Sequence, residues 1–223
     1  MKVSNSEISD ISAQLILPLF EDTKKAPNKS LSGLNRSQRG LVREALGSGG
    51  FEAKKGTRMS LWTPSCNIIL VGMGDREGMS HKKARNAGAR LISSLSKKKG
   101  TDLTVRFTTG WDGDRMVDFA EGMMLRDYDF LEHQEKPDDH IEEEWKVDFQ
   151  ASGRHQEKLS VELQNVQSVV KGVHTARDLG NEPANVLYPM EYARRALEWA
   201  EGKENVKVEV MIGRNCTSLE WED

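Results

Sequence analysis

The amino-acid sequence predicts an α/β protein with a mainly parallel central sheet, followed by a linking helix and an incomplete second domain. Over the first 150 residues, short apolar runs of strand length alternate with amphipathic stretches of helix length. This order is typical of a parallel sheet that helices cover on both faces. A segment rich in helix-ending residues, 176–189, then separates that region from one more helical stretch.

The first elements follow from hydrophobic patterning. Residues 14–20 (Gln-Leu-Ile-Leu-Pro-Leu-Phe) are a short apolar run, which predicts a buried strand. Residues 21–32 are polar and indicate an exposed loop. Residues 37–46 have a helical pattern that ends at the glycine-rich 48–50.

The middle of the chain continues the alternation. Residues 57–62 and 102–107 predict strands, and 67–72 (Asn-Ile-Ile-Leu-Val-Gly) is the clearest buried strand. Between them, 79–96 has the apolar spacing of a helix. Gly88 lies beside the apolar face of that helix, and we expect it to allow close packing on the sheet at some cost in helix propensity.

Two more helices and one strand complete this region. A turn at 111–114 leads into a helix that carries Met116, Phe119, Ala120, Met123 and Met124. Residues 133–144 are acidic and predict a loop, and 145–149 predict a strand. A long amphipathic helix follows, and its apolar stripe consists of Leu159, Leu163, Val166, Val170 and Val173.

The segment that ends the long helix is organised by glycine and proline. Gly180 can take the left-handed conformation that ends a helix, and Pro183 cannot continue one. Pro189 suits the first position of a new helix over 190–200. Alternation of valine with charged residues at 206–210 then predicts a half-buried strand with an unpaired edge.

This segment resembles the connector between the two domains of the leucyl aminopeptidases, also called cytosol aminopeptidases, a family of hexameric two-metal exopeptidases. The family pattern is A-R-D-L-x-N-E-P-x-N-x-L-x-P. The matching residues are Ala176, Arg177, Asp178, Leu179, Asn181, Glu182, Pro183, Asn185, Leu187 and Pro189. Tyr188 departs from the family, which often has Thr there, and Tyr cannot cap the next helix well.

The preceding region is similar to the N-terminal domain of the same family. The similar features are Gly50-Phe51-Glu52, Lys55-Gly56, the run 69–74 and Tyr128-Asp129-Phe130. The resemblance implies a macro-domain-like three-layer fold over 1–150, a linking helix over 151–180 and the truncated start of a catalytic domain over 181–223.

The resemblance also implies a function. The parent would be a metallopeptidase that removes N-terminal residues from peptides with two divalent metals, zinc or manganese, and that forms a homo-hexamer. This sequence has no N-T-D-A-E-G-R motif, which supplies metal ligands in the family. We therefore assign no catalytic, cofactor-binding or metal-binding residue and expect this chain alone to be an inactive, non-catalytic portion.

Bulk properties limit the other interpretations. The net charge is −3, yet residues 1–110 contain 19 Lys/Arg against 9 Asp/Glu, and 111–223 contain 13 against 26. The two cysteines, Cys66 and Cys216, do not make a disulfide framework and indicate reduced thiols. No apolar run is long enough for a signal core or a bilayer crossing, so we expect a cytoplasmic protein with no membrane partner.

Four groups of residues are candidates for a binding or catalytic site. The glycine loop Gly72–Gly78 follows a strand, but its spacing is not the dinucleotide fingerprint, and Asp75 and Glu77 repel phosphate. We interpret it as a tight turn. Cys66 has no His nearby in the sequence. The acidic loop group is interpreted as solvated rather than metal-binding, and it comprises His133, Asp138, Asp139, His140, Glu142, Glu143 and Glu144. Four polar residues of the connector, Arg177, Asp178, Asn181 and Glu182, are expected to satisfy backbone groups at the helix end.

Two alternatives of other classes stay open. The first is a stand-alone macro-like module that binds a nucleotide such as ADP-ribose, with the Gly72–Gly78 loop as its phosphate site. The second is nucleic-acid binding by the basic first half, which is less expected because no aromatic residues interleave with its lysine clusters. Such binding would weaken steeply with salt.

Overall fold

The computed structural model describes residues 1–8, 11–23, 28–48, 50–95, 101–133 and 144–211. The chain forms two compact units, residues 1–174 and 175–223. The first unit contains the whole sheet, and the predicted α/β class is confirmed.

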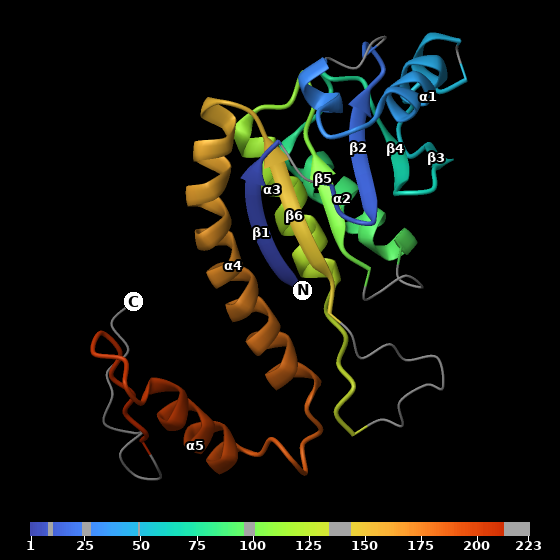
Figure 1. Ribbon diagram of the computed structural model, residues 1–223. Coiled ribbons are helices and arrows are strands. Elements are labelled where there is room, and N and C mark those ends of the chain that lie inside the picture. The colour runs from blue at the N-terminus through green and yellow to red at the C-terminus, as the bar shows by residue number, and fades with distance from the viewer. Residues whose placement is uncertain (9–10, 24–27, 49, 96–100, 134–143, 212–223) are drawn as a thin grey trace. The chain divides into compact units, whose positions relative to one another are not determined.

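The first unit is built on one six-stranded sheet (Figure 1). The strand order is β1-β6-β5-β2-β4-β3, and every neighbouring pair is parallel except β3 with β4. The strands are β1 (Lys2–Glu7), β2 (Gln14–Phe20), β3 (Arg58–Trp62), β4 (Asn67–Gly74), β5 (Leu103–Arg106) and β6 (Lys146–Ala151). Each strand predicted before residue 150 is therefore present, and β4 runs two residues further than expected.

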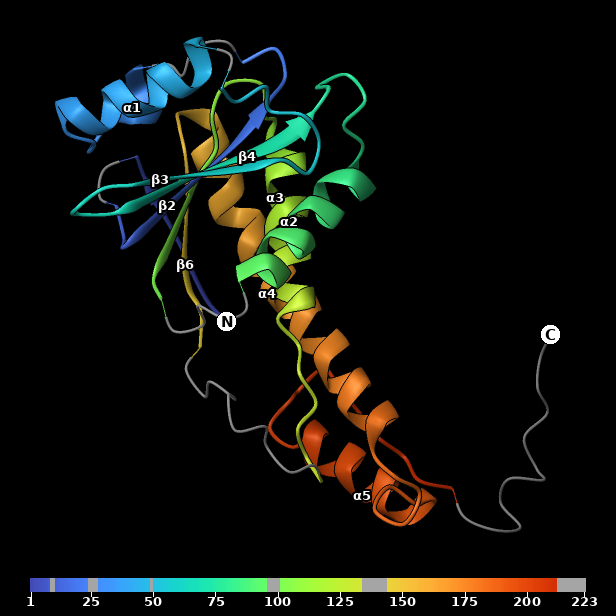
Figure 2. The same ribbon diagram turned by 90° about the vertical axis from the view of Figure 1, so that its right-hand side faces the viewer.

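Helices cover both faces of this sheet. Figure 2 shows α1 on one face and α2 and α3 on the other, which makes the three layers. The helices are α1 (Arg36–Gly47), α2 (His81–Leu95), α3 (Gly113–Arg126) and α4 (Arg154–Asn181), with a short 3-10 helix, η1 (Asn28–Leu31). Alternating side chains of the strands therefore enter two separate cores.

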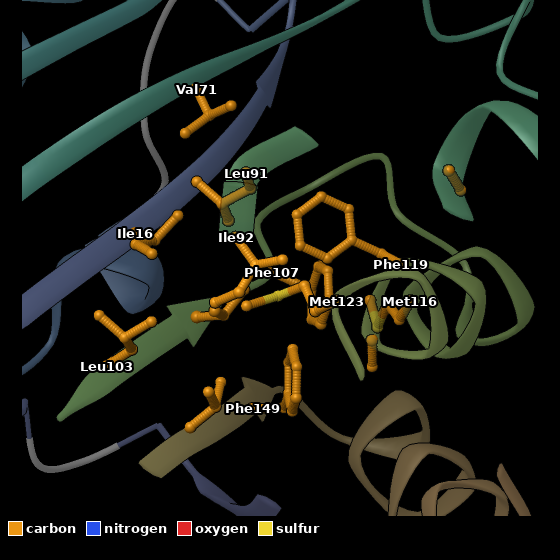
Figure 3. Close-up of a cluster of buried hydrophobic side chains, with 14 of the residues drawn as sticks. Ile16, Val71, Leu91, Ile92, Leu103, Phe107, Met116, Phe119, Met123 and Phe149 are labelled. Carbon is orange, nitrogen blue, oxygen red and sulfur yellow. The ribbon is translucent and has the colours of Figure 1, made fainter. Parts of the chain in front are cut away.

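The central strand β2 shows why its sequence is apolar throughout. All seven of its residues are buried. Leu15 and Leu17 pack into the core under α1, whereas Ile16 and Phe20 pack into the larger core under α2, α3 and α4. Figure 3 shows the larger core, where Ile16 and Phe119 lie among apolar side chains from the sheet and helices. A strand covered on both faces needs apolar residues at consecutive positions.

The strand β1 was missed in the sequence, which shows no apolar run there. Its polar side chains are satisfied by its neighbour β6: Ser4 and Ser6 donate hydrogen bonds to Asp148 at 3.0 and 2.6 Å. Only Val3 contributes partly buried apolar surface to the larger core. Tertiary pairing with β6 therefore defines this edge strand, because local patterning does not.

Gly88 allows a close approach, but to a helix and not to the sheet as expected. A Cβ at Gly88 would lie 1.9 Å from the Phe119 carbonyl oxygen of α3, and a Cβ at Gly122 would lie 1.8 Å from the Arg85 carbonyl oxygen of α2. The backbones of α2 and α3 thus meet at these two glycines. The cost in helix propensity at each glycine is offset by the packing of the two helices against one another.

The end of α4 differs from the expectation. Gly180 is within the helix and is absent from the residues with positive φ, and α4 continues to Asn181. Pro183 follows two residues later, so the proline rather than the glycine limits the helix. The Glu182 amide donates to the Asp178 carbonyl at 3.1 Å and completes the last turn.

The described part of the second unit contains one further helix, α5 (Pro189–Ala200). Pro189 is at its first position, and Tyr188 at the N-cap makes no side-chain capping hydrogen bond, as expected. The prediction of a strand at 206–210 is wrong, because the structure describes these residues and they lie outside any strand. Their alternating pattern finds no neighbouring strand to pair with in the described part of the chain, and an isolated segment cannot form a ladder.

Candidate functional site

The topological switch point of the sheet is the first place to look for a ligand. After β2 the chain adds β3 and β4 on one side of β2 in the sheet. It then passes through α2 to β5, which lies on the other side of β2, so the switch point lies between β2 and β5. In doubly wound sheets, ligands bind outside the carboxyl ends of the strands at this point. Here the chain's own side chains occupy it.

Two of those side chains are Trp111 and Arg76. The Trp111 indole donates to the Pro18 carbonyl at 3.0 Å, and its ring lies 5.1 Å from that of Phe20. The guanidinium of Arg76 lies over the Phe20 ring, 5.7 Å from the ring centroid, and pairs with Asp22 at 2.7 Å. These contacts fill the carboxyl end of β2 and weigh against a nucleotide there.

The tight turn predicted for the Gly72–Gly78 loop is present at residues 75–78, because β4 continues to Gly74. A Cβ at Gly72 would lie 2.1 Å from the Lys54 carbonyl oxygen, so only glycine fits this approach. The Asp75 carboxylate accepts hydrogen bonds from the amides of Glu77 and Gly78 at 3.2 and 3.0 Å. Because a carboxylate of the chain already takes these two amides, a phosphate group would have to displace it.

A pocket of about 600 Å³ lies beside this turn, between β3, β4 and α2. Its lining combines an aliphatic surface with several charged side chains. The apolar residues are Val71, Met73, Met79, Ala87 and Leu91. The charged residues are Glu21, Lys55, Arg58, Asp75, Lys83 and Arg90. Sequence reasoning missed this pocket because Lys55 and Arg90 are 35 positions apart and no motif links them.

A buried arginine, Arg106, crosses the core at the end of β5. It is fully buried, and its guanidinium donates to Gln150 Oε1 at 2.9 and 2.7 Å and to the Ser32 carbonyl at 2.6 Å. Burial lowers the pKa of the Arg106 guanidinium to about 10, and the nearby Asp148 carboxylate opposes this shift. The group stays charged at neutral pH and fastens the segment after η1 to the sheet.

Two of the candidate site residues, Cys66 and Glu144, have structural partners in the fold. Cys66 is buried and accepts a hydrogen bond from Gln38 at 3.3 Å, which indicates a structural thiol. Cys216 and the acidic positions 138–140, 142 and 143 lie outside the described residues. Glu144 pairs with Lys2 at 3.2 Å.

His81 contacts a carboxylate in a helix-to-helix ion-pair cluster. Its Nδ1 lies 2.6 Å from Asp118 Oδ2. Arg85 reaches Asp118 at 2.9 Å and Glu121 at 2.6 Å. These contacts join α2 to α3 and accompany the close approach at Gly88.

Glu182 of the connector and Glu191 of α5 are paired with arginines. Glu182 accepts from Arg195 at 3.0 Å, and Arg195 also reaches Glu191 at 2.9 Å. Arg194 contacts Glu191 at 2.6 Å. Hydrogen bonds from Arg194 and then Arg195 lower the pKa of Glu191 to about 2. A metal ion at these carboxylates would have to compete with the arginines.

Fold and connector together define a class: an α/β module followed by a long helix and a second unit. Comparison with known proteins specifies it further. The family model described as the N-terminal domain of the cytosol aminopeptidase family matches residues 16–137. The chain belongs to the cytosol aminopeptidase family.

Relatives and solved structures agree with this assignment. A probable cytosol aminopeptidase of Sinorhizobium fredii is 30% identical over 195 residues, which are 81% of this chain and 37% of the relative. One from Rhizobium etli is 32% identical over 188 residues, 78% of this chain and 35% of the relative. A tomato leucine aminopeptidase mutant has the same fold over 90% of this chain and 42% of its own, with a TM-score of 0.66 at 18% identity.

The matches also show how much of the relatives this chain represents. The alignment with a probable cytosol aminopeptidase of Rippkaea orientalis covers 215 residues, so it extends past the first unit, yet it spans only 41% of that relative. A bottromycin maturation enzyme, BotP, solved in complex with Mn, matches with a TM-score of 0.57 at 17% identity. Within the described ranges, no helix of this chain has the length and apolarity that a bilayer crossing requires.

Proposed function

We propose that this chain is the N-terminal, non-catalytic portion of a leucyl aminopeptidase-like exopeptidase that removes N-terminal residues from peptides. Family membership supports the reaction class. The two-fifths share of the relatives supports a non-catalytic role for the first unit. The single observation that carries the proposal is that α5 is amphipathic but buries none of its residues.

No residue of α5 is buried, although its sequence is amphipathic. Its large apolar side chains are about half exposed, and they are Met190, Tyr192, Leu197 and Trp199. A helix of a globular domain normally buries its apolar stripe. We assign α5 to the start of a catalytic domain, whose remaining parts would cover this stripe. The proposed domains are 1–150, a linking helix over 151–180, and 181–223.

Two carboxylates described in this chain are poor candidates for ligands of the zinc or manganese of the whole enzyme. Glu182 and Glu191 are paired with arginines, and the sequence has no N-T-D-A-E-G-R motif. Activation of a water by two metals therefore belongs to ligands supplied by other residues. We place the assembled enzyme in the cytoplasm, acting on peptides as a homo-hexamer, with this portion stabilising the assembly or restricting access to its active site.

An activity assay and the gene sequence test the proposal together. We expect this chain to release no p-nitroaniline from leucine p-nitroanilide with Mn²⁺ or Zn²⁺ above the rate of metal alone. We expect the reading frame beyond the Asp223 codon to encode a Lys, Asp and Glu ligand set. Hydrolysis by the chain itself would overturn its non-catalytic role. A stop codon directly after Asp223 would restrict aminopeptidase activity to the relatives.

The ADP-ribose alternative gains no support from the geometry. Its phosphate site would be the Gly72–Gly78 loop, where Asp75 takes two amides, and its crevice would be the switch point that Trp111 and Arg76 occupy. Titration calorimetry with ADP-ribose should therefore give no binding heat, and micromolar affinity would restore that alternative.

A further inference from the structure

The pocket between β3, β4 and α2 is surrounded by positive charge. Lys83 and Arg90 are seven residues apart on α2 and so share one side of the helix. Arg58 comes from β3, and Lys55 comes from the turn before it. The carboxylates in the lining are Glu21 and Asp75, and Asp75 is held by two backbone amides. The pocket therefore has a surplus of cations.

Two of the four cations are held by the protein, and two are not. Arg58 donates to Ser94 Oγ at 3.0 Å, and Lys83 donates to the Gly78 carbonyl at 2.5 Å. Among the described residues, Lys55 and Arg90 have no hydrogen-bond or ion-pair partner. A ligand anion could therefore bind Lys55 and Arg90 without displacing an existing hydrogen bond or ion pair of either side chain.

The apolar residues of the lining indicate which chemical group would accompany the anionic group of the ligand. Val71, Met73 and Leu91 are buried core residues whose surfaces reach the pocket, and Ala87 leaves space on α2. Aliphatic and thioether groups make up this surface, and none of the described residues that line the pocket is aromatic. Nucleobases and other flat rings are usually held by stacking on aromatic side chains, so this lining favours a flexible aliphatic body.

We propose that this pocket binds a small organic anion with an aliphatic body, an alkyl carboxylate or alkyl phosphate, with its anionic head between Lys55 and Arg90. A volume of about 600 Å³ is that of a small-molecule site. The binding needs only the first unit and is independent of the proposed exopeptidase activity, so the failure of one does not affect the other.

The probe is sodium octanoate, titrated into the isotope-labelled full chain and followed by amide chemical shifts. We expect saturable shifts at Gly72, Gly74, Ala87 and Leu91. Acetate has the charge without the body, and octyltrimethylammonium has the body with the opposite charge. Both should bind at least about tenfold more weakly, since each lacks one of the two contributions. Octyl phosphate should bind at the same residues as octanoate and shows which head group is preferred.

Matched variants separate the pocket from general surface charge. Lys55→Gln and Arg90→Gln should each weaken octanoate binding about tenfold, because each removes one charge-assisted contact. Lys82→Gln changes a neighbouring exposed lysine of α2 that is not in the lining, and it should leave affinity unchanged. Ala87→Leu should block the aliphatic body while all four cations remain. The amide spectrum of each variant reports whether it is folded, and the two glutamine variants decide alone if Ala87→Leu does not fold.

Three results would overturn the proposal. The first is an absence of octanoate shifts at concentrations up to about 10 mM, a range that corresponds to a binding free energy weaker than about 3 kcal/mol. The second is affinity that the Lys55→Gln/Arg90→Gln double variant leaves unchanged. The third is binding of ADP-ribose at these residues with no binding of octanoate, which would make the pocket a nucleotide site.

Discussion

The helices α3 and α5 have similar lengths and similar amphipathic sequences, but they differ in what covers them. Eight residues of α3 are buried, among them Phe119, whose ring meets Phe107 and Trp111 edge-on. No residue of α5 is buried. An apolar stripe thus indicates that a helix packs against a partner surface. It does not indicate which part of the protein supplies that surface.

The first turn of α3 is also better stabilised than the first turn of α5. Asp112 caps α3, and its carboxylate accepts from the Arg115 amide at 2.9 Å. Tyr188 occupies the equivalent position of α5 and caps nothing. The helix inside a complete core thus has local and tertiary support, whereas α5 depends on Pro189 and on arginine–glutamate pairs.

The largest expected difference comes from truncating one apolar side chain on each helix. Phe119→Ala should lower the free energy of unfolding of the first unit by about 3–5 kcal/mol, because a fully buried ring leaves a cavity. Leu197→Ala should change stability by less than about 0.5 kcal/mol, because Leu197 is 45% exposed. Urea unfolding followed by circular dichroism measures both. Equal losses would show that α5 packs in a core and would end the comparison.

A smaller difference is expected from exchanging the caps. Asp112→Ala should cost about 1 kcal/mol by leaving amides at the start of α3 without an acceptor. Tyr188→Ser should do the opposite and stabilise α5 by up to about 1 kcal/mol. Amide hydrogen exchange resolves each helix by itself. Slower exchange in α5 of the serine variant is the expected result, and unchanged exchange there would show that capping does not limit this helix.

The smallest effect concerns pH. The Glu191 pKa lies at about 2, below its usual 4.5, so its ion pairs stabilise α5 at pH above 4.5 and are lost as pH falls through about 2. Carbon-13 titration of the Glu191 carboxylate should give this midpoint, and Arg194→Gln/Arg195→Gln should move it back toward 4.5. The first turn of α3 has its own pair, Asp112 with Arg115 at 2.7 Å, so the helicity of α3 should not follow the Glu191 titration. A Glu191 midpoint near 4.5 in the unaltered chain would contradict the ion-pair geometry.

The candidate sites show the limits of sequence reasoning most clearly. The turn within Gly72–Gly78 was predicted correctly, although it lies at 75–78 after β4, because glycines and acidic residues act locally. The pocket beside it was not, since Lys55 and Arg90 converge only when β3 packs next to α2. Arg106 alternates with the apolar residues of its strand, as a solvent-facing residue would, and its burial depends on Gln150 and the segment after η1.

The sequence by itself determined the order and type of nearly all elements, the α/β class, the connector with Pro183 and Pro189, and membership in the cytosol aminopeptidase family. These depend on the periodicity of nearby residues and on backbone limits that act within one turn or strand. Tertiary structure decided that β1 pairs with β6, that Gly88 meets α3, and that 206–210 forms no strand. Each of these requires a partner distant in the chain, and a partner's position is set by packing of the whole unit.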